Sequence, residues 1–262
     1  MKTQIILIAA LLVIPTSQSD SRPPLLPRDV VAALASGLSG ETAKSNLEFI
    51  ARQHRMRASR GYRAAVEHIA DRLRSYGLSE VRIEQFPADG RSMYGTQKSR
   101  PAWDVDFAEL WELEETAGGW EPAHRLANYD AMPITLAQDS DSADVVADLV
   151  DVGAGTSESD YEGKDVRGKI VLTSSQPGAT AALAVDRYGA AGMVSYAQNQ
   201  VTAWWKEDEN LIRWGHLDSF SPRRTFGFMV SLKQARTFRE RLARGEHIRM
   251  HAKVEGARHE GF

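Results

Sequence analysis

Apolar residues recur at helical spacing in two segments near the beginning of the chain. The first pattern predicts a helix over residues 40–54 with Ser39 as its N-cap. The second predicts a helix over 60–76 that begins after Ser59 and ends at Gly77. The apolar stripes consist of Ala43, Leu47 and Ile50 in the first helix and of Tyr62, Val66, Ile69 and Leu73 in the second. Each helix therefore has one face that another element must cover.

An alternating pattern follows these helices. Residues 81–86 and 103–113 alternate between apolar and polar positions, which predicts two strands. In the second strand, Val105, Phe107, Glu109 and Trp111 are expected on one side and Leu110 on the other. Residues 114–120, which contain Gly118-Gly119, predict a turn region.

From about residue 142 onward, short apolar runs alternate with helical patterns. Strands are predicted at 145–152, 166–172, 192–196, 226–230 and 248–254, and helices at 179–188 and from Ser231 to Gly245. Ser231 is expected to cap the second of these helices, with Gln234 placed for a capping box. Its apolar face comprises Leu232, Ala235, Phe238 and Leu242. Alternating strands and helices predict a small α/β unit, interrupted by a long loop over 197–222.

The N-terminus carries a different signal. Met1-Lys2 precedes an apolar run over residues 5–15, and small residues precede Asp20. This pattern predicts a Sec-type signal peptide over 1–19, with an uncleaved anchor as the alternative. Residues 20–39 form an N-terminal arm that begins with a proline-rich lead-in over 20–28. The expected location is secreted or periplasmic, with no membrane attachment after cleavage.

Composition narrows the classes of partner. The 262 residues are 42% hydrophobic and 26% charged, with a net charge of -3. These values are ordinary for a globular protein, and the charge gives no reason to expect a nucleic-acid partner. There is no cysteine, which excludes disulfides and thiol catalysis; for an exported protein, this fits bacterial export.

Two parts of the sequence resemble known families. Residues 163–172, 184–196 and 228–231 are similar to the protease-associated (PA) domain, in which a D-V-x-G-K-I-V-L strand is followed by a helix and a G-A-x-G-hydrophobic strand. The preceding segments 47–54, 57–62, 70–78 and 81–86 resemble the N-terminal region of M28-type zinc aminopeptidases. Ala58 stands where that family often has glycine.

The resemblance implies an α/β fold with two parts. Residues 40–141 would be the N-terminal portion of a zinc-peptidase-like α/β catalytic domain, 142–254 an inserted PA domain, and 255–262 a truncated return segment. Such enzymes hydrolyse an N-terminal peptide bond with zinc-bound water and a Glu base. The family's zinc ligands cluster downstream of the PA domain. A missing C-terminal catalytic portion would therefore supply them, and this chain alone is expected to be inactive.

No residue of the chain is assigned a catalytic or metal-binding role. His216 and Asp218 have the His-x-Asp spacing of a metal motif, but they lie inside the predicted PA loop and are interpreted as solvated loop residues. His247 and His251 fall on a predicted strand, where four residues span about 13 Å, too far to share one ion. His54 is expected at the end of the first helix, where a cation is favourable.

Two further features concern binding. The sequence Gly153-x-Gly155-x-Ser157 lacks the remaining residues of a phosphate loop or a nucleophile elbow, and it predicts only a turn. Three tryptophans in the 197–222 loop are candidates for contact with a peptide or protein substrate or a partner: Trp204, Trp205 and Trp214. The alternative is that they cover the PA core.

Two hypotheses about function remain. In the first, the chain is the N-terminal portion of an exported metallo-aminopeptidase. In the second, it is a non-catalytic PA-domain module that binds a peptide or protein through residues 197–222. Half of a sheet domain would leave a strand edge and apolar helix faces exposed, so the first hypothesis predicts self-association or binding of a hydrophobic dye.

Overall fold

The protein has a mixed α/β fold in the computed structural model, which describes residues 25–198 and 208–262. The predicted signal peptide over 1–19 lies outside these residues. The chain divides into two compact units, one ending at Glu48 and the other running from Phe49 to Phe262. Within the described ranges, no helix is both long and apolar enough to span a membrane.

The first unit contains helix α1 (Arg28–Gly37) and most of helix α2 (Gly40–Arg52). Helix α1 lies within the segment predicted as an arm. Helix α2 begins where it was predicted, and the Ser39 hydroxyl accepts a hydrogen bond from the Thr42 amide at 3.1 Å. Neither helix has a buried residue, so their apolar stripes contribute little to the core.

Helix α3 (Arg60–Ser75) confirms the second predicted helix. The Ser59 hydroxyl accepts a hydrogen bond from the Tyr62 amide at 3.1 Å, and Gly77 follows the helix with a φ of +86°. Only Ala65 and Ala70 are buried on this helix. Its predicted apolar stripe is therefore not part of the main hydrophobic core.

The strand predicted at 81–86 is not present. This segment has no regular secondary structure, and no described strand pairs with it. The reason is physical: alternation describes which faces a strand would present, whereas a strand exists only when a neighbour takes up its backbone hydrogen bonds. A small hairpin of β1 (Met93–Tyr94) and β2 (Gln97–Lys98) follows.

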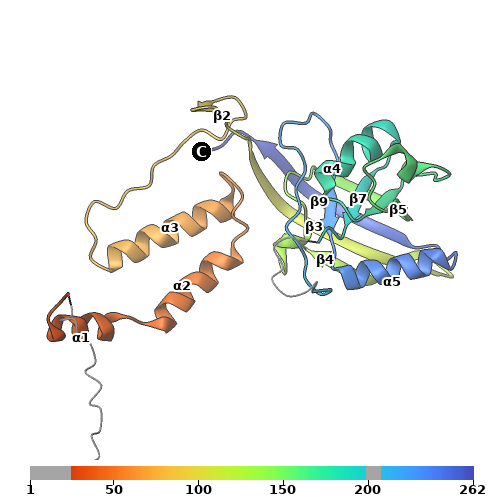
Figure 1. Ribbon diagram of the computed structural model, residues 1–262. Coiled ribbons are helices and arrows are strands. Elements are labelled where there is room, and N and C mark those ends of the chain that lie inside the picture. Colours follow the sequence, from red (N-terminus) through yellow and green to blue (C-terminus); the bar gives the residue numbers. More distant parts are fainter. Residues whose placement is uncertain (1–24, 199–207) are drawn as a thin grey trace, which may run out of the picture. The chain divides into compact units, whose positions relative to one another are not determined.

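A seven-stranded mixed sheet organises the rest of the second unit (Figure 1). Its strands are β3 (Ala102–Thr116), β4 (Gly119–Asn128), β5 (Ala143–Asp151), β6 (Ile170–Thr173), β7 (Gly192–Ser195), β8 (Gly227–Met229) and β9 (Arg249–His259). They are arranged in the order β4-β3-β9-β5-β6-β7-β8. Strands β5 to β8 are parallel, whereas β4, β3, β9 and β5 pair antiparallel.

Strands β3 and β9 differ from their predicted forms. A bulge in β3 between Val105 and Phe107 shifts the register, so Val105 is buried while Phe107 is only partly covered. Strand β9 continues past Val254 to His259 and pairs with β3 along its length, so most of the predicted return segment is part of the sheet. The sheet thus contains strands from both sides of the boundary predicted at residue 142.

The parallel half of the sheet is buried on both faces, as parallel sheets require. Helix α5 (Leu232–Ala243) packs with Ile170, Leu172 and Phe228 in one hydrophobic cluster, which includes the buried Phe238. On the other face, α4 (Pro177–Ala181) and the π-helix η3 (Ala182–Arg187) pack against Val171 and Met193. Two 3-10 turns, η1 (Pro133–Thr135) and η2 (Glu158–Tyr161), complete the described elements.

The predicted cap of α5 is confirmed, because the Ser231 hydroxyl accepts a hydrogen bond from the Gln234 amide at 3.2 Å. Strand β4 was not predicted. It is polar, contains Pro122 and lies at the sheet edge, where a proline costs no ladder hydrogen bond.

Candidate functional site

A groove of about 970 Å³ lies within the second unit. One wall is α3, and the whole predicted apolar stripe of this helix lines it. The other walls come from the segment 81–86, the end of the chain at Phe262, and the side chain of Trp214. The walls of the groove combine apolar side chains with arginines and carboxylates, and its volume lies at the upper end of the range of ligand pockets.

Trp214 lines this groove, and it is the one tryptophan of the three candidates that lies among the described residues; Trp204 and Trp205 lie outside them. Its side chain is 41% exposed, and its ring stacks on His216 with centroids 4.9 Å apart. Its carbonyl accepts a hydrogen bond from Gln176 Nε2 at 3.3 Å. The indole is therefore held in place while part of it stays open to solvent.

His216 and Asp218 take separate roles, as the sequence interpretation expects of loop residues. Burial, with the nearby charges of Arg100 and Arg213, lowers the pKa of His216. The Asp218 carboxylate accepts a hydrogen bond from the Phe220 amide at 3.0 Å and thereby stabilises a turn. His216 is half-buried under Trp214 rather than solvated, which corrects the expectation for that residue.

A buried carboxylate lies behind the groove. Asp139 has a φ of +64°, and its side chain is fully buried. It accepts hydrogen bonds from Gln138 Nε2 at 2.8 Å, from the Ser219 hydroxyl at 2.6 Å, and from Arg57 Nη2 at 3.1 Å. Burial lowers the pKa of Arg57, and Asp139 opposes that effect. Through this carboxylate, the linker between α2 and α3 is connected to the loop that carries Ser219.

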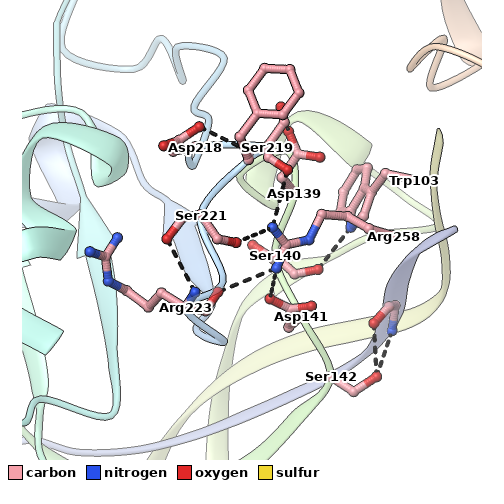
Figure 2. A network of polar contacts seen from close by, with 12 residues as sticks. Trp103, Asp139, Ser140, Asp141, Ser142, Asp218, Ser219, Ser221, Arg223 and Arg258 are labelled. Atoms are coloured by element: carbon pink, nitrogen blue, oxygen red, sulfur yellow. Dashed lines mark hydrogen bonds and ion pairs between the residues drawn. The ribbon is translucent and has the colours of Figure 1, made fainter. Parts of the chain in front are cut away.

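A second cluster joins the same loop to β9 (Figure 2). Arg258 Nη2 donates to Asp141 Oδ2 at 2.9 Å, and Nη1 donates to the carbonyl oxygens of Ser219 at 3.2 Å and Ser221 at 2.7 Å. Burial raises the pKa of Asp141, and the charge of Arg258 acts in the opposite direction. Trp103 Nε1 donates to the Ser140 carbonyl at 2.8 Å beside this cluster.

His54 differs from its expected role. It lies beyond the end of α2, and its Nδ1 is 2.7 Å from the Tyr129 hydroxyl. Its ring meets Trp103 edge-on, with centroids 5.6 Å apart. Burial, followed by the charge of Arg55, lowers the pKa of His54 to about 4, so the ring is neutral at pH 7. The expectation of a cation at a helix end is wrong, because packing against the sheet removes the ring from water.

The remaining candidates form no metal centre. His251 Nε2 is 2.7 Å from Asp144, His259 Nε2 is 3.1 Å from Asp104, and His247 is exposed before β9. Ser157 caps the short helix η2, so the glycine-containing turn before it has a local structural role. Within residues 25–198 and 208–262, no group of three or more His, Asp or Glu could hold a metal ion. The described donors therefore do not fit the zinc centre that the resemblance implies.

Comparison with solved structures identifies the fold. The model is similar to the Peptidase M28 precursor from Shewanella amazonensis SB2B, with a TM-score of 0.50 and 15% identity over 89% of this chain and 52% of that chain. Two other matches are an aminopeptidase from Aneurinibacillus sp. strain AM-1 (TM-score 0.45, 20% identity, 85% and 46% coverage) and a zinc aminopeptidase from Bacillus subtilis (TM-score 0.46, 13% identity, 83% and 44% coverage).

The chain thus spans about half the length of the solved structures that it matches. No family model matches the sequence, and the search of curated proteins found no match. At 15% identity, the similarity to the Shewanella structure shows a shared α/β fold, as the sequence predicted.

Proposed function

We propose that the protein is the N-terminal portion of an exported metallo-aminopeptidase of the M28 type. The observation that carries the proposal is the fold shared with the Peptidase M28 precursor, which covers 89% of this chain but 52% of that one. Residues 1–19 would direct export, leading to a secreted or periplasmic location. Residues 142–254, joined by the β3–β4 hairpin, would form the PA domain.

The groove supports the same proposal on physical grounds. Helix α3 directs an apolar stripe into it, and the segment 81–86 beside the stripe has no strand partner among the described residues. In the proposed enzyme, the remaining catalytic portion packs on these surfaces and provides the zinc ligands. The substrate would be a peptide, and Trp204, Trp205 and Trp214 would contact it or a partner. The chain alone would not hydrolyse peptides.

The test is to read the coding DNA beyond the codon for Phe262 in all three forward frames. We expect a His-x-Asp motif, an Asp/Asn-rich segment and a Glu-Glu pair within the next few hundred bases. The joined protein should then hydrolyse an aminoacyl p-nitroanilide, and a chelator should abolish the activity. An unrelated gene after a clean stop codon would overturn the proposal.

In that case a second function would be favoured, a non-catalytic PA-domain module that binds a peptide or protein. The observation in its favour is that the seven-stranded sheet buries a hydrophobic cluster on each face with helices of the same chain. Its test is binding of unstructured peptides to the full chain, with loss of affinity in the variant Trp214→Ala.

A further inference from the structure

A second cavity lies apart from the groove and shares no lining residue with it. Its volume is about 540 Å³. It is formed by the turn at Asp89, Lys98 of strand β2, the loop over residues 219–224, and the residues 256–258 of strand β9. Asp141 and Ser142 also line the cavity, so four parts of the chain that are distant in sequence meet at one concave surface. The volume is within the size range of ligand pockets.

The polar groups on the floor of this cavity are paired with one another. Arg258 is neutralised by Asp141 and donates to loop carbonyls, as Figure 2 shows. Ser142 is also engaged: its hydroxyl donates to the Gly256 carbonyl at 2.9 Å and accepts from the Gly256 amide at 3.0 Å. The floor therefore has no spare charge with which to bind a ligand.

The mouth of the cavity is different, because Lys98 and Arg224 are both exposed there. Among the described residues, neither side chain has an ion pair or a hydrogen bond. The Lys98 ammonium lies over the ring of Phe220, whose centroid is 5.2 Å from Nζ. Arg224 acts on Asp141 only through its charge. The neighbouring Arg223, in contrast, is paired with Asp186.

Among the described residues, neither of the two acidic residues of the wall, Asp89 and Asp141, is ion-paired with either of these cations. Asp141 is paired with Arg258. Asp89 accepts hydrogen bonds from the Arg91 and Ser92 amides, both at 2.8 Å, and from the Ser92 hydroxyl at 2.8 Å. These bonds hold the pKa of Asp89 at about 2, so it remains charged. Because Arg258 offsets the charge of Asp141, the remaining charges of Lys98, Arg224 and Asp89 sum to +1, which favours a monoanion over a dianion such as sulfate.

Apolar surface adjoins the cations. The Phe220 side chain is 45% exposed, and Pro101 and Pro222 also line the cavity. We propose that this cavity binds a carboxylate attached to an apolar group, with Lys98 and Arg224 pairing with the carboxylate and Phe220 covering the apolar part. An acidic side chain and a C-terminal carboxylate of a polypeptide share this chemistry. The site does not depend on the proposed peptidase function.

Matched peptides test the proposal by calorimetric titration of the full chain. One pair is acetyl-Ala-Phe-Asp-Ala-amide and its Asn counterpart, and the other is acetyl-Ala-Ala-Phe with a free or an amidated C-terminus. We expect one acid to bind about tenfold more tightly than its amide, because each charge-assisted hydrogen bond contributes roughly that factor. The pair that shows the difference identifies the source of the carboxylate. Affinity should fall as salt is raised.

Variants separate this site from general electrostatics. K98Q together with R224Q should abolish the preference for the acid, whereas K164Q together with R187Q, which removes the same charge elsewhere, should retain it. F220A should weaken the binding of the acid and amide peptides equally, because both carry the apolar group that Phe220 covers. Equal binding of acid and amide in both pairs, or a preference that survives in the K98Q/R224Q variant, would overturn the proposal. Displacement of the peptide by inorganic sulfate at equal concentration would overturn the monoanion assignment, because sulfate is a dianion at neutral pH.

Discussion

Phe238 of α5 and Ile69 of α3 occupy the same kind of position, an apolar residue within the stripe of an amphipathic helix. Phe238 is 0% exposed, because the sheet covers its helix face. Ile69 is 43% exposed, because its helix face lines an open groove. Periodicity is present in both helices, and only one of them has a layer to pack against.

Strand β6 and the segment 81–86 differ in the same way: both have a strand-like sequence pattern, but in the described part of the chain only β6 has neighbouring strands. Strand β6 is buried at every position between two parallel neighbours, whereas 81–86 has no strand partner among the described residues. The sheet and its helices thus enclose buried hydrophobic clusters, while α3 and the segment after it present apolar surface that no other described element covers. In the proposed enzyme, the remaining catalytic portion would pack on this apolar surface.

The strongest test of the comparison between α5 and α3 is to truncate the side chains of Phe238 and Ile69. Phe238→Ala should lower the free energy of unfolding by about 3–5 kcal/mol, because it removes a buried ring and leaves a cavity. Ile69→Ala should lower it by less than about 1 kcal/mol, because the site is already open. Urea unfolding followed by circular dichroism measures both. Equal losses would show that α3 is packed as tightly as α5.

The buried carboxylate behind the groove should give the next largest effect. Asp139→Ala leaves Arg57 without its ion-pair partner and removes acceptors from Gln138 and Ser219, so we expect a loss of about 3 kcal/mol. Asp218→Ala is the control, because that exposed carboxylate accepts one local bond, and its loss should be within about 0.5 kcal/mol. Similar melting temperatures for the two variants would contradict this role.

Acid should destabilise the contact between His54 and the sheet. The pKa of His54 is about 4 in the folded chain and 6.5 ordinarily, so between these values the unfolded chain binds the proton more tightly. The contribution of neutral His54 to the free energy of unfolding is therefore complete above pH 6.5. As the pH falls toward 4, about 2–3 kcal/mol of it is lost. Urea unfolding at pH 7 and pH 4.5 should show a smaller pH dependence for His54→Gln than for wild type. The control His247→Gln should retain the full dependence.

The smallest effect on stability should come from the exposed segment itself. Ile83→Lys combined with Phe86→Lys should change the free energy of unfolding by no more than about 0.5 kcal/mol, because both side chains are exposed. The wild-type chain should bind a hydrophobic dye or self-associate, and the double variant should do so less. A wild-type protein that is monomeric and silent to the dye would contradict the view that this surface needs a cover.

The sequence predicted those elements whose signals are local. Side-chain caps at Ser39, Ser59 and Ser231 and the apolar strands of the parallel half were identified, because each depends on neighbouring residues. The prediction was wrong at 81–86 and missed β4, because strand formation depends on a partner distant in sequence. The bulge in β3 was also missed, since the alternation of residue types continues through it.

The candidate functional site was harder to predict from the sequence than the fold. Trp214 lies on the groove, but its contact with a peptide or partner stays a prediction. Asp139 and Arg258 each connect segments that are far apart in the sequence. The residues around them give no sign of these contacts, because polar loop residues are usually solvated. Their pairing arises only from the tertiary fold, as does the burial that keeps His54 neutral.

The position of β9 in the sheet has a consequence for how the chain is made. The strand lies between β3 and β5, and its residue His259 pairs with Ala102, well over a hundred residues earlier. During synthesis, β3 and β5 emerge from the ribosome long before the strand that joins them. The sheet can therefore be completed only after β9 has been synthesised. Many of its contacts join segments that are far apart in the sequence, and proteins with such topologies fold slowly. If the protein is exported as proposed above, a chain that remains unfolded for this time would be available to an export channel that accepts only unfolded polypeptides.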